Sequence, residues 1–328
     1  MATPIWKGYT VSQQTEDDSL SYIIKCDGVT IYTGKAYKRP GASDISFNIG
    51  DVCAPFLSSN AKIATATTGF LATNEMQRTF VVEDLSGAVL ATVDFSNDWS
   101  YSNKLPNKLY AADPVRAVVD PRQLLLVSVY GAKSFKADIS KTEWWAKVEL
   151  YFGDAASGVG MVKLSDYPTA NRIAMFATDD PSSHLYTQQN YMVQNTCVRY
   201  VLYYVNAFGG WDSLLTAGND KRVDNYTRST YKKVYSPSDL SDRGTVNYRN
   251  DIERTISLVT DWLTDEESAR MHHLFGSTNV LLHDLVDDII RPVTITAKSW
   301  TEKTFRNNGA KLVNYQIDVT IAQDFVRL

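Results

Sequence analysis

Histidines beside aspartates are the first residues in this sequence that could do chemistry, because such groups bind metal ions and transfer protons. His283 and Asp284 stand close to Asp287 and Asp288. In a short hairpin these four groups more simply mark a solvated turn. We therefore expect neither a metal centre nor an acid–base pair there.

The other histidines give no stronger signal for a metal. His272 and His273 are adjacent, and neighbouring residues on a helix point about 100° apart. A helical metal pair needs a spacing of three or four residues, so these two should not bind one ion together. The fourth histidine is His184, and the chain contains no His-Glu-x-x-His pair.

The string Gly209-Gly210-Trp211-Asp212-Ser213 places a serine beside an acid after an apolar stretch. It does not match the Gly-x-Ser-x-Gly elbow of serine hydrolases, and the chain lacks a phosphate-binding Gly-x-x-x-x-Gly-Lys-Ser/Thr loop. We expect a structural role instead. Two glycines let the backbone turn sharply, and Trp211 packs back over a sheet.

Two acidic clusters, Glu16-Asp17-Asp18 and Asp179-Asp180, lie in polar, loop-like surroundings. A glycoside hydrolase needs two carboxylates that converge in space, which spacing along the sequence cannot show. We assign no catalytic, cofactor-binding or metal-binding residue, and we predict that the protein is not an enzyme and needs no cofactor.

The three cysteines, Cys26, Cys53 and Cys197, are odd in number and far apart. They form no Cys-x-x-Cys motif and no even set of the kind found in secreted disulfide-rich proteins. Each lies in or beside an expected strand, which favours buried packing thiols in a reducing compartment over activated nucleophiles.

The composition is that of a folded chain. Of 328 residues, 44% are hydrophobic and 21% are charged, which argues against disorder along most of the length. Aromatic residues, at 12%, favour strands and interfaces. The net charge of −4 provides no basic field for nucleic acid, so binding to it is disfavoured. We find no signal peptide, and no apolar run is long enough to span a membrane.

Two hairpin signals organise the first hundred residues. Asp27-Gly28 between apolar runs predicts a type I′ turn, and Ser86-Gly87 predicts a second hairpin. Between them, apolar and polar residues alternate over residues 45–49, as in a half-buried strand. Residues 1–104 should therefore form one small β-sandwich or barrel.

A segment with two prolines, residues 103–114, predicts a linker before a second β domain at residues 105–216. The last strand of that domain, residues 198–205, is nearly all apolar and should be covered on both faces. Its other strands should lie at residues 124–130, 144–152 and 172–176.

Residues 217–250 are polar and contain four tyrosines and several basic residues: Lys221, Arg222, Arg228, Lys232, Lys233, Arg243 and Arg249. Basic residues among aromatics can bind nucleic acid, but the same pattern suits an arm that docks on an acidic neighbour. Because the chain is acidic overall, we favour the second interpretation and expect a polar extended arm or long loop.

Residues 251–328 should form a C-terminal β segment with one helix at residues 264–276. Thr264 and Glu267 have the spacing of a capping box, and Gly276 marks the helix end. Whether this segment shares a core with residues 105–216 stays open. The predicted fold class is mainly β, with sandwich or barrel modules and one or two short helices as a minor α+β component.

Several strings resemble a family of uncharacterised virion structural proteins, of tail or baseplate type, from phages and prophages of gut bacteria. The resemblance is strongest in the C-terminal part, and it touches the N-terminal part as well. The strings are Tyr200 to Ser213, Trp262 to Ser277, Lys303 to Leu312, Ile31 to Gly41 and Asp94 to Tyr101. The resemblance implies a virion component and assigns no catalytic residue.

We therefore expect a non-enzymatic structural subunit of a phage tail or baseplate, folded in the host bacterial cytoplasm and carried in the virion. Its partners would be further copies of itself, in a ring, and other virion proteins. The alternative is a receptor- or carbohydrate-binding module for fibre attachment with a ligand on the host surface, which an exposed groove lined with aromatic rings would favour.

Overall fold

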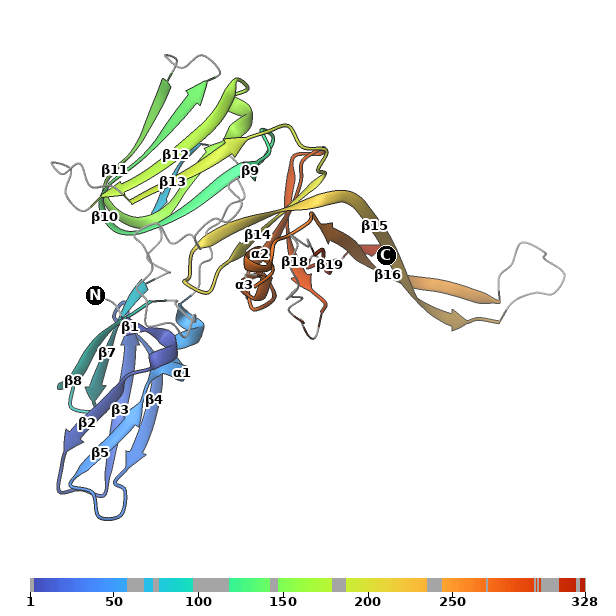
Figure 1. Ribbon diagram of the computed structural model, residues 1–328. Coiled ribbons are helices and arrows are strands. Elements are labelled where there is room, and N and C mark those ends of the chain that lie inside the picture. The colour runs from blue at the N-terminus through green and yellow to red at the C-terminus, as the bar shows by residue number, and fades with distance from the viewer. Residues whose placement is uncertain are drawn as a thin grey trace. The chain divides into compact units, whose positions relative to one another are not determined.

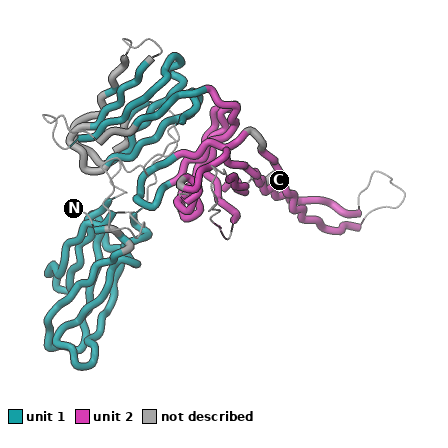
Figure 2. Tube along the Cα trace, viewed as in Figure 1, with its two compact units in different colours: residues 1–194, 205–212 teal, residues 195–204, 213–328 magenta. Residues whose placement is uncertain are grey.

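The computed structural model describes the following residues: 3–57, 68–72, 77–96, 118–141, 147–178, 187–234, 244–269, 271–297, 299, 301, 313–322 and 325–327. Strands dominate and helices are short, which confirms the mainly β fold class (Figure 1). Two compact units divide the chain: residues 1–194 with 205–212, and residues 195–204 with 213–328 (Figure 2). The expected linker at 103–114 and the string at 303–312 both lie outside the described residues.

The N-terminal part of the first unit is a small sandwich. One sheet has the order β1-β8-β7-β3-β4, and the other pairs β2 with β5. The bounds are β1 (Thr3–Pro4), β2 (Thr10–Gln14), β3 (Ser19–Cys26), β4 (Val29–Tyr37), β5 (Asp44–Asn48), β7 (Gln77–Asp84) and β8 (Val89–Ser96). Ile24, Phe80 and Phe95 from the larger sheet share one core with Val11 and Ile45 from the smaller.

Turn chemistry in this sandwich follows the sequence. Asp27 and Gly28 have φ of 51° and 80°, the two positive values that a type I′ turn requires, so the predicted hairpin is confirmed. The second hairpin, β7 to β8, is also confirmed, and Gly87 has a φ of 88°. Short helical turns that the sequence did not predict are η1 (Ile5–Lys7), α1 (Gly50–Cys53) and η2 (Ala54–Phe56).

A second sheet in the first unit has the order β6-β11-β10-β12-β13-β9. Its bounds are β6 (Gly69–Ala72), β9 (Val118–Val119), β10 (Leu124–Lys141), β11 (Lys147–Lys163), β12 (Ala170–Thr178) and β13 (Thr187–Val193), with the turn η3 (Leu164–Asp166) after β11. Val127, Phe135, Val162, Ile173 and Met175 belong to its core. The sheet takes β6 from within the expected first domain, residues 1–104.

The second unit is built on a closed barrel. Its sheet has the order β15-β14-β17-β18-β19-β16-β20, and β15 also pairs with β16, so six strands close a ring and β20 lies beside β16. The bounds are β14 (Tyr200–Val205), β15 (Trp211–Lys232), β16 (Thr245–Thr260), β17 (Val280–Asp284), β18 (Ile289–Ile295), β19 (Gln316–Ile321) and β20 (Phe325–Arg327). All six residues of β14 are buried, as expected. The expected boundary between residues 216 and 217 lies within β15, and strands from both sides of it form one barrel.

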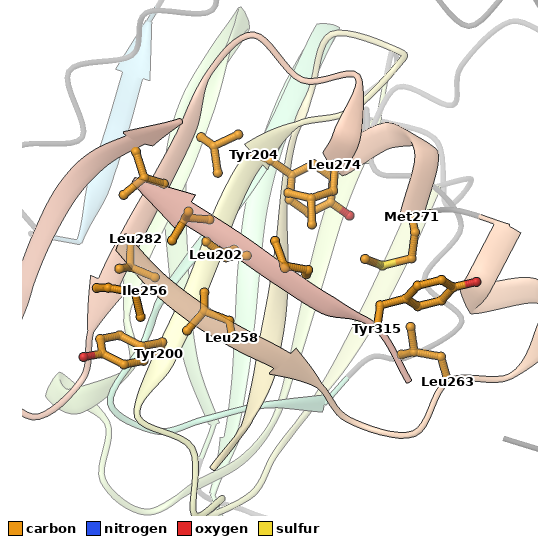
Figure 3. Packing of buried hydrophobic residues seen from close by; sticks show 14 of the residues in the cluster. Tyr200, Leu202, Tyr204, Ile256, Leu258, Leu263, Met271, Leu274, Leu282 and Tyr315 are labelled. Carbon is orange, nitrogen blue, oxygen red and sulfur yellow. The ribbon is translucent and has the colours of Figure 1, made fainter. Parts of the chain in front are cut away.

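Inward-facing side chains of the barrel form a single core that two short helices help to close. Tyr200 and Leu282 lie in this core with Met271, Leu274 and Tyr315, and Figure 3 shows Tyr200 and Leu282 at one end and Met271 and Tyr315 at the other. In place of the one expected helix there are α2 (Asp265–Ala269) and α3 (Met271–Phe275). No helix among the described residues is long and apolar enough to cross a membrane.

The capping box at the start of α2 is confirmed. The amide of Thr264 donates to Oε2 of Glu267 at 2.7 Å, and the amide of Glu267 donates to Oγ1 of Thr264 at 3.3 Å. Each side chain thus satisfies an amide at the helix end that would otherwise have no partner within the helix.

The segment 217–250, expected to be a polar extended arm or a long loop, is a two-stranded ribbon in its described residues. β15 and β16 pair from Thr216 and Thr260 outward to Lys232 and Thr245 (Figure 1). β20 follows β16 only over residues 250–252. Both faces of the outer ribbon meet water, so its strands lack the apolar alternation that marks a half-buried strand.

Candidate functional site

His283 is buried and hydrogen-bonded, which corrects its assignment to a solvated turn. Its Nδ1 lies 3.1 Å from the hydroxyl of Tyr203, and its Nε2 lies 3.0 Å from Oδ1 of Asp288. The imidazole is 1% exposed and Tyr203 is fully buried. The turn itself, residues 285–288, does carry exposed aspartates, but His283 precedes it in β17. Because Tyr203 and His283 are closed to solvent, a substrate could not reach them.

The glycine string makes the sharp turn that the sequence predicts. Gly209 has a φ of 87°, and the side-chain oxygen of Asn206 accepts hydrogen bonds from the amides of Phe208 and Gly210, each at 3.0 Å. Trp211 is buried, and its backbone amide donates to Oγ of Ser128 in β10 at 2.8 Å. These contacts support the structural role expected for this string.

The adjacent histidines of α3 lie closer than their 100° divergence predicts. The ring centroids of His272 and His273 are 4.0 Å apart, because rotation about the side-chain bonds brings the rings together. Nδ1 of His272 contacts the carbonyl of Ala269, and His273 is buried. Across the residues that the structure describes, no group of three or more His, Cys, Asp or Glu could hold a metal.

The cysteines divide into two kinds. Cys26 and Cys53 are buried, as expected, and burial together with the nearby Cys26 raises the pKa of Cys53 to about 12. Cys197 is exposed, which corrects its assignment as a packing thiol. It lies between β13 and β14, in a segment without regular structure. All three thiols are free.

Of the acidic clusters, Glu16-Asp17-Asp18 is exposed between β2 and β3. Asp179-Asp180 lies outside the described residues, as do His184 and Arg243.

The outer end of the ribbon presents aromatic and cationic side chains. We call residues 226–234 and 244–250 the ribbon tip. Tyr226, Tyr231 and Tyr248 are about half exposed, at 54%, 49% and 58%, and the rings of Tyr231 and Tyr248 are 6.2 Å apart. The tip contains four basic residues and no acidic residue: Arg228, Lys232, Lys233 and Arg249.

A polar pocket of about 110 Å³ opens at the ribbon end of the barrel, and we call it the barrel-mouth pocket. Tyr200 begins β14, Asp284 ends β17, Ile289 begins β18 and Ile321 ends β19, so antiparallel pairing brings these strand ends together. The lining is Tyr200, Arg222, Arg254, Ile256, Leu282, Asp284, Asp287, Ile289, Arg291 and Ile321. The apolar side chains of this lining are Ile256, Leu282, Ile289 and Ile321. Three of them, Ile256, Leu282 and Ile321, also belong to the barrel core, as does Tyr200.

Asp284 is the centre of the charged contacts in this pocket. Oδ2 of Asp284 accepts from Arg199 at 3.0 Å and from Arg222 at 3.2 Å, and Arg222 also donates to the hydroxyl of Tyr200. Burial opposes the charged form of Asp284, but hydrogen bonds from Arg199 and from the amide of Val286 outweigh it and lower the pKa.

The other arginines differ in how they are held. Arg254 forms a two-pronged pair with Asp224, with N–O distances of 2.7 and 2.9 Å, and this hydrogen-bonded pair lowers the pKa of Asp224. Arg291 lies opposite Leu282 in the register of β17 and β18, and its side chain makes no ion pair or hydrogen bond with any described residue. The pocket thus contains one guanidinium that the chain leaves without a partner among those residues.

Sequence reasoning missed this pocket. In the sequence, Arg222 stands in a basic segment and Asp284 beside a turn, and neither Arg254 nor Arg291 belongs to a recognisable motif. Their separation along the chain gives no sign that they meet, since the barrel register alone brings them together.

Comparison with known proteins identifies no family. No family model matches the chain, and no curated protein matches it. A solved structure of a Ca²⁺-stabilized adhesin that helps an Antarctic bacterium reach out and bind ice aligns over 95% of this chain and 93% of its own, with 11% identity and a TM-score of 0.16. At that score the likeness carries no argument about fold or function.

Proposed function

We propose that this protein is a non-enzymatic structural subunit of a bacteriophage particle, a tail or baseplate component that assembles with copies of itself through the ribbon tip. The strings resembling phage virion proteins support the virion setting, and two of them form β14 with its turn and helices α2 and α3. The observation that carries the assembly role is the ribbon, which presents exposed tyrosines and cations beyond the barrel core.

Charge complementarity supports a second copy as the partner. The whole chain has a net charge of −4, and the four basic residues of the tip contribute +4, so the remainder carries −8. A cationic tip is therefore attracted to the rest of another copy, and exposed acidic runs such as Glu16-Asp17-Asp18 offer it contacts. Tyrosines are enriched at interfaces because they bury a large apolar area and keep a polar end.

Mass measurement by light scattering, followed by negative-stain imaging, tests this proposal on the full chain. A ring or another defined oligomer is expected, and it should dissociate as salt rises, because salt screens exposed charges. The double variant Tyr226→Ser/Tyr248→Ser should lower the assembled fraction. The control is Tyr37→Ser, which removes a tyrosine that is 66% exposed on β4, and it should assemble like the unmodified chain.

A monomer at all concentrations, or equal assembly of the double variant, would overturn the assembly role. An elongated trimer would instead favour the receptor- or carbohydrate-binding module as the function.

A further inference from the structure

The barrel-mouth pocket has the geometry of a small-ligand site. Pockets at the mouths of barrels recur as binding sites, and a volume of 110 Å³ accommodates several water molecules or a small organic ion. The packed core beneath provides the floor, and charged side chains provide the rim.

The charges of the lining select an anion. The lining contains three arginines, Arg222, Arg254 and Arg291, and two aspartates, Asp284 and Asp287. Arg222 is held by Asp284 and Arg254 by Asp224, so Arg291 is the guanidinium that remains for a ligand. A monoanion would neutralise the guanidinium of Arg291.

The same features favour a carboxylate over a phosphate. A guanidinium presents a planar fork that matches the two oxygens of a carboxylate. Asp284 and Asp287 would repel the second charge of a phosphate dianion. The apolar floor, which includes Ile256, Leu282 and Ile321, suits a short alkyl stem next to the charged group.

We propose that the barrel-mouth pocket binds a carboxylate monoanion on a short apolar stem, with Arg291 pairing with the carboxylate and the floor contacting the stem. The carboxylate could belong to a free short-chain acid or to an acidic side chain of another protein chain. This inference does not depend on the proposed function, because a chain that never assembles could still bind the anion.

Titration of the full chain with butyrate, followed by calorimetry and by NMR of arginine side-chain N–H groups, tests the proposal. Saturable binding with a shift of one guanidinium resonance is expected. Arg291→Gln should weaken butyrate binding by about tenfold or more, because it removes a charge-assisted pair. The control is Arg228→Gln, which removes an exposed arginine of the ribbon tip and should bind butyrate unchanged.

Two further probes separate the sources and the chemistries. N-acetylglutamate amide mimics an acidic side chain, and tighter binding than butyrate would assign the pocket to a protein partner, whereas tighter butyrate binding would assign it to a free acid. Inorganic phosphate should bind more weakly than either. The proposal is wrong if no carboxylate binds saturably, if Arg291→Gln binds equally well while showing an unchanged melting temperature, or if phosphate binds best.

Discussion

The hydroxyl oxygen of Tyr203 lies 3.1 Å from Nδ1 of His283. The other ring nitrogen of His283 bonds Asp288, a residue with a positive φ of 51° in the turn between β17 and β18. The imidazole therefore links a fully buried tyrosine of β14 to the hairpin turn that follows β17.

Replacing this histidine should destabilise the barrel. His283→Phe removes both hydrogen bonds at a buried position, and we expect a loss of about 1–3 kcal/mol in the free energy of unfolding. Urea denaturation followed by circular dichroism measures the loss. His272→Phe, at an exposed histidine of α3, is the control and should cost less. Equal losses in the two variants would contradict a special role for His283.

A methyl group added at Gly160 should destabilise the six-stranded sheet of the first unit. A Cβ added there would lie 2.8 Å from Cζ of Phe135 in the core, so Phe135 would have to move. Gly160→Ala should therefore cost about 1–3 kcal/mol through overpacking. Gly69→Ala is a matched control, since Gly69 pairs with Met161 in the same sheet and nothing lies within 4 Å of its added Cβ. Thermal melts that rank Gly69→Ala as the more damaging change would overturn this account.

Asp284 should make the free energy of unfolding depend on pH. Its pKa in the folded chain is lowered from 3.8, because hydrogen bonds from Arg199 and Val286 outweigh the opposing effect of burial. The folded state therefore holds this proton less readily than the unfolded state. The resulting stabilisation is present above pH 3.8 and is lost as pH falls through the lowered value.

Asp284→Asn should remove this contribution. The difference in melting temperature between the unmodified chain and the variant should shrink as pH falls below 3.8. The control is Asp17→Asn, at an exposed position between β2 and β3. A difference that stays constant or grows on acidification would refute the assignment.

Thiol reactivity should separate the cysteines. Cys197 is exposed, whereas Cys26 and Cys53 are buried and the raised pKa of Cys53, about 12, disfavours its reactive thiolate. Ellman's reagent should therefore modify one thiol quickly in the native chain and the other two only after unfolding. Cys197→Ser should abolish the fast reaction, and a fast phase that persists in this variant would show that a buried position is open to solvent.

Local signals predicted local structure well. Asp27-Gly28 fixed a hairpin, Thr264 and Glu267 marked the start of a helix, and the apolar run of β14 indicated a strand covered on both faces. Each of these depends on neighbours in the sequence, so sequence alone suffices.

Features set by long-range pairing could not be predicted in this way. His283 looked solvated because aspartates follow it, yet pairing with β14 places it beside Tyr203. The sequence did not reveal the two paired strands of the ribbon. Both of their faces meet water, so the apolar alternation that marks a half-buried strand is absent. Arg222 and Arg291 meet at one pocket only because the barrel closes.

Although the barrel is closed, the outer part of the ribbon has unpaired strand edges. A closed ring of strands has no edge, but β15 and β16 continue past it as a pair. β14 is only six residues long, and β20 reaches only residues 250–252, so among described residues no third strand borders the outermost part of the ribbon. Such bare edges are templates for strand addition by another chain. A strand of another chain could therefore pair with an edge of the ribbon through backbone hydrogen bonds, and no part of the barrel would have to unfold.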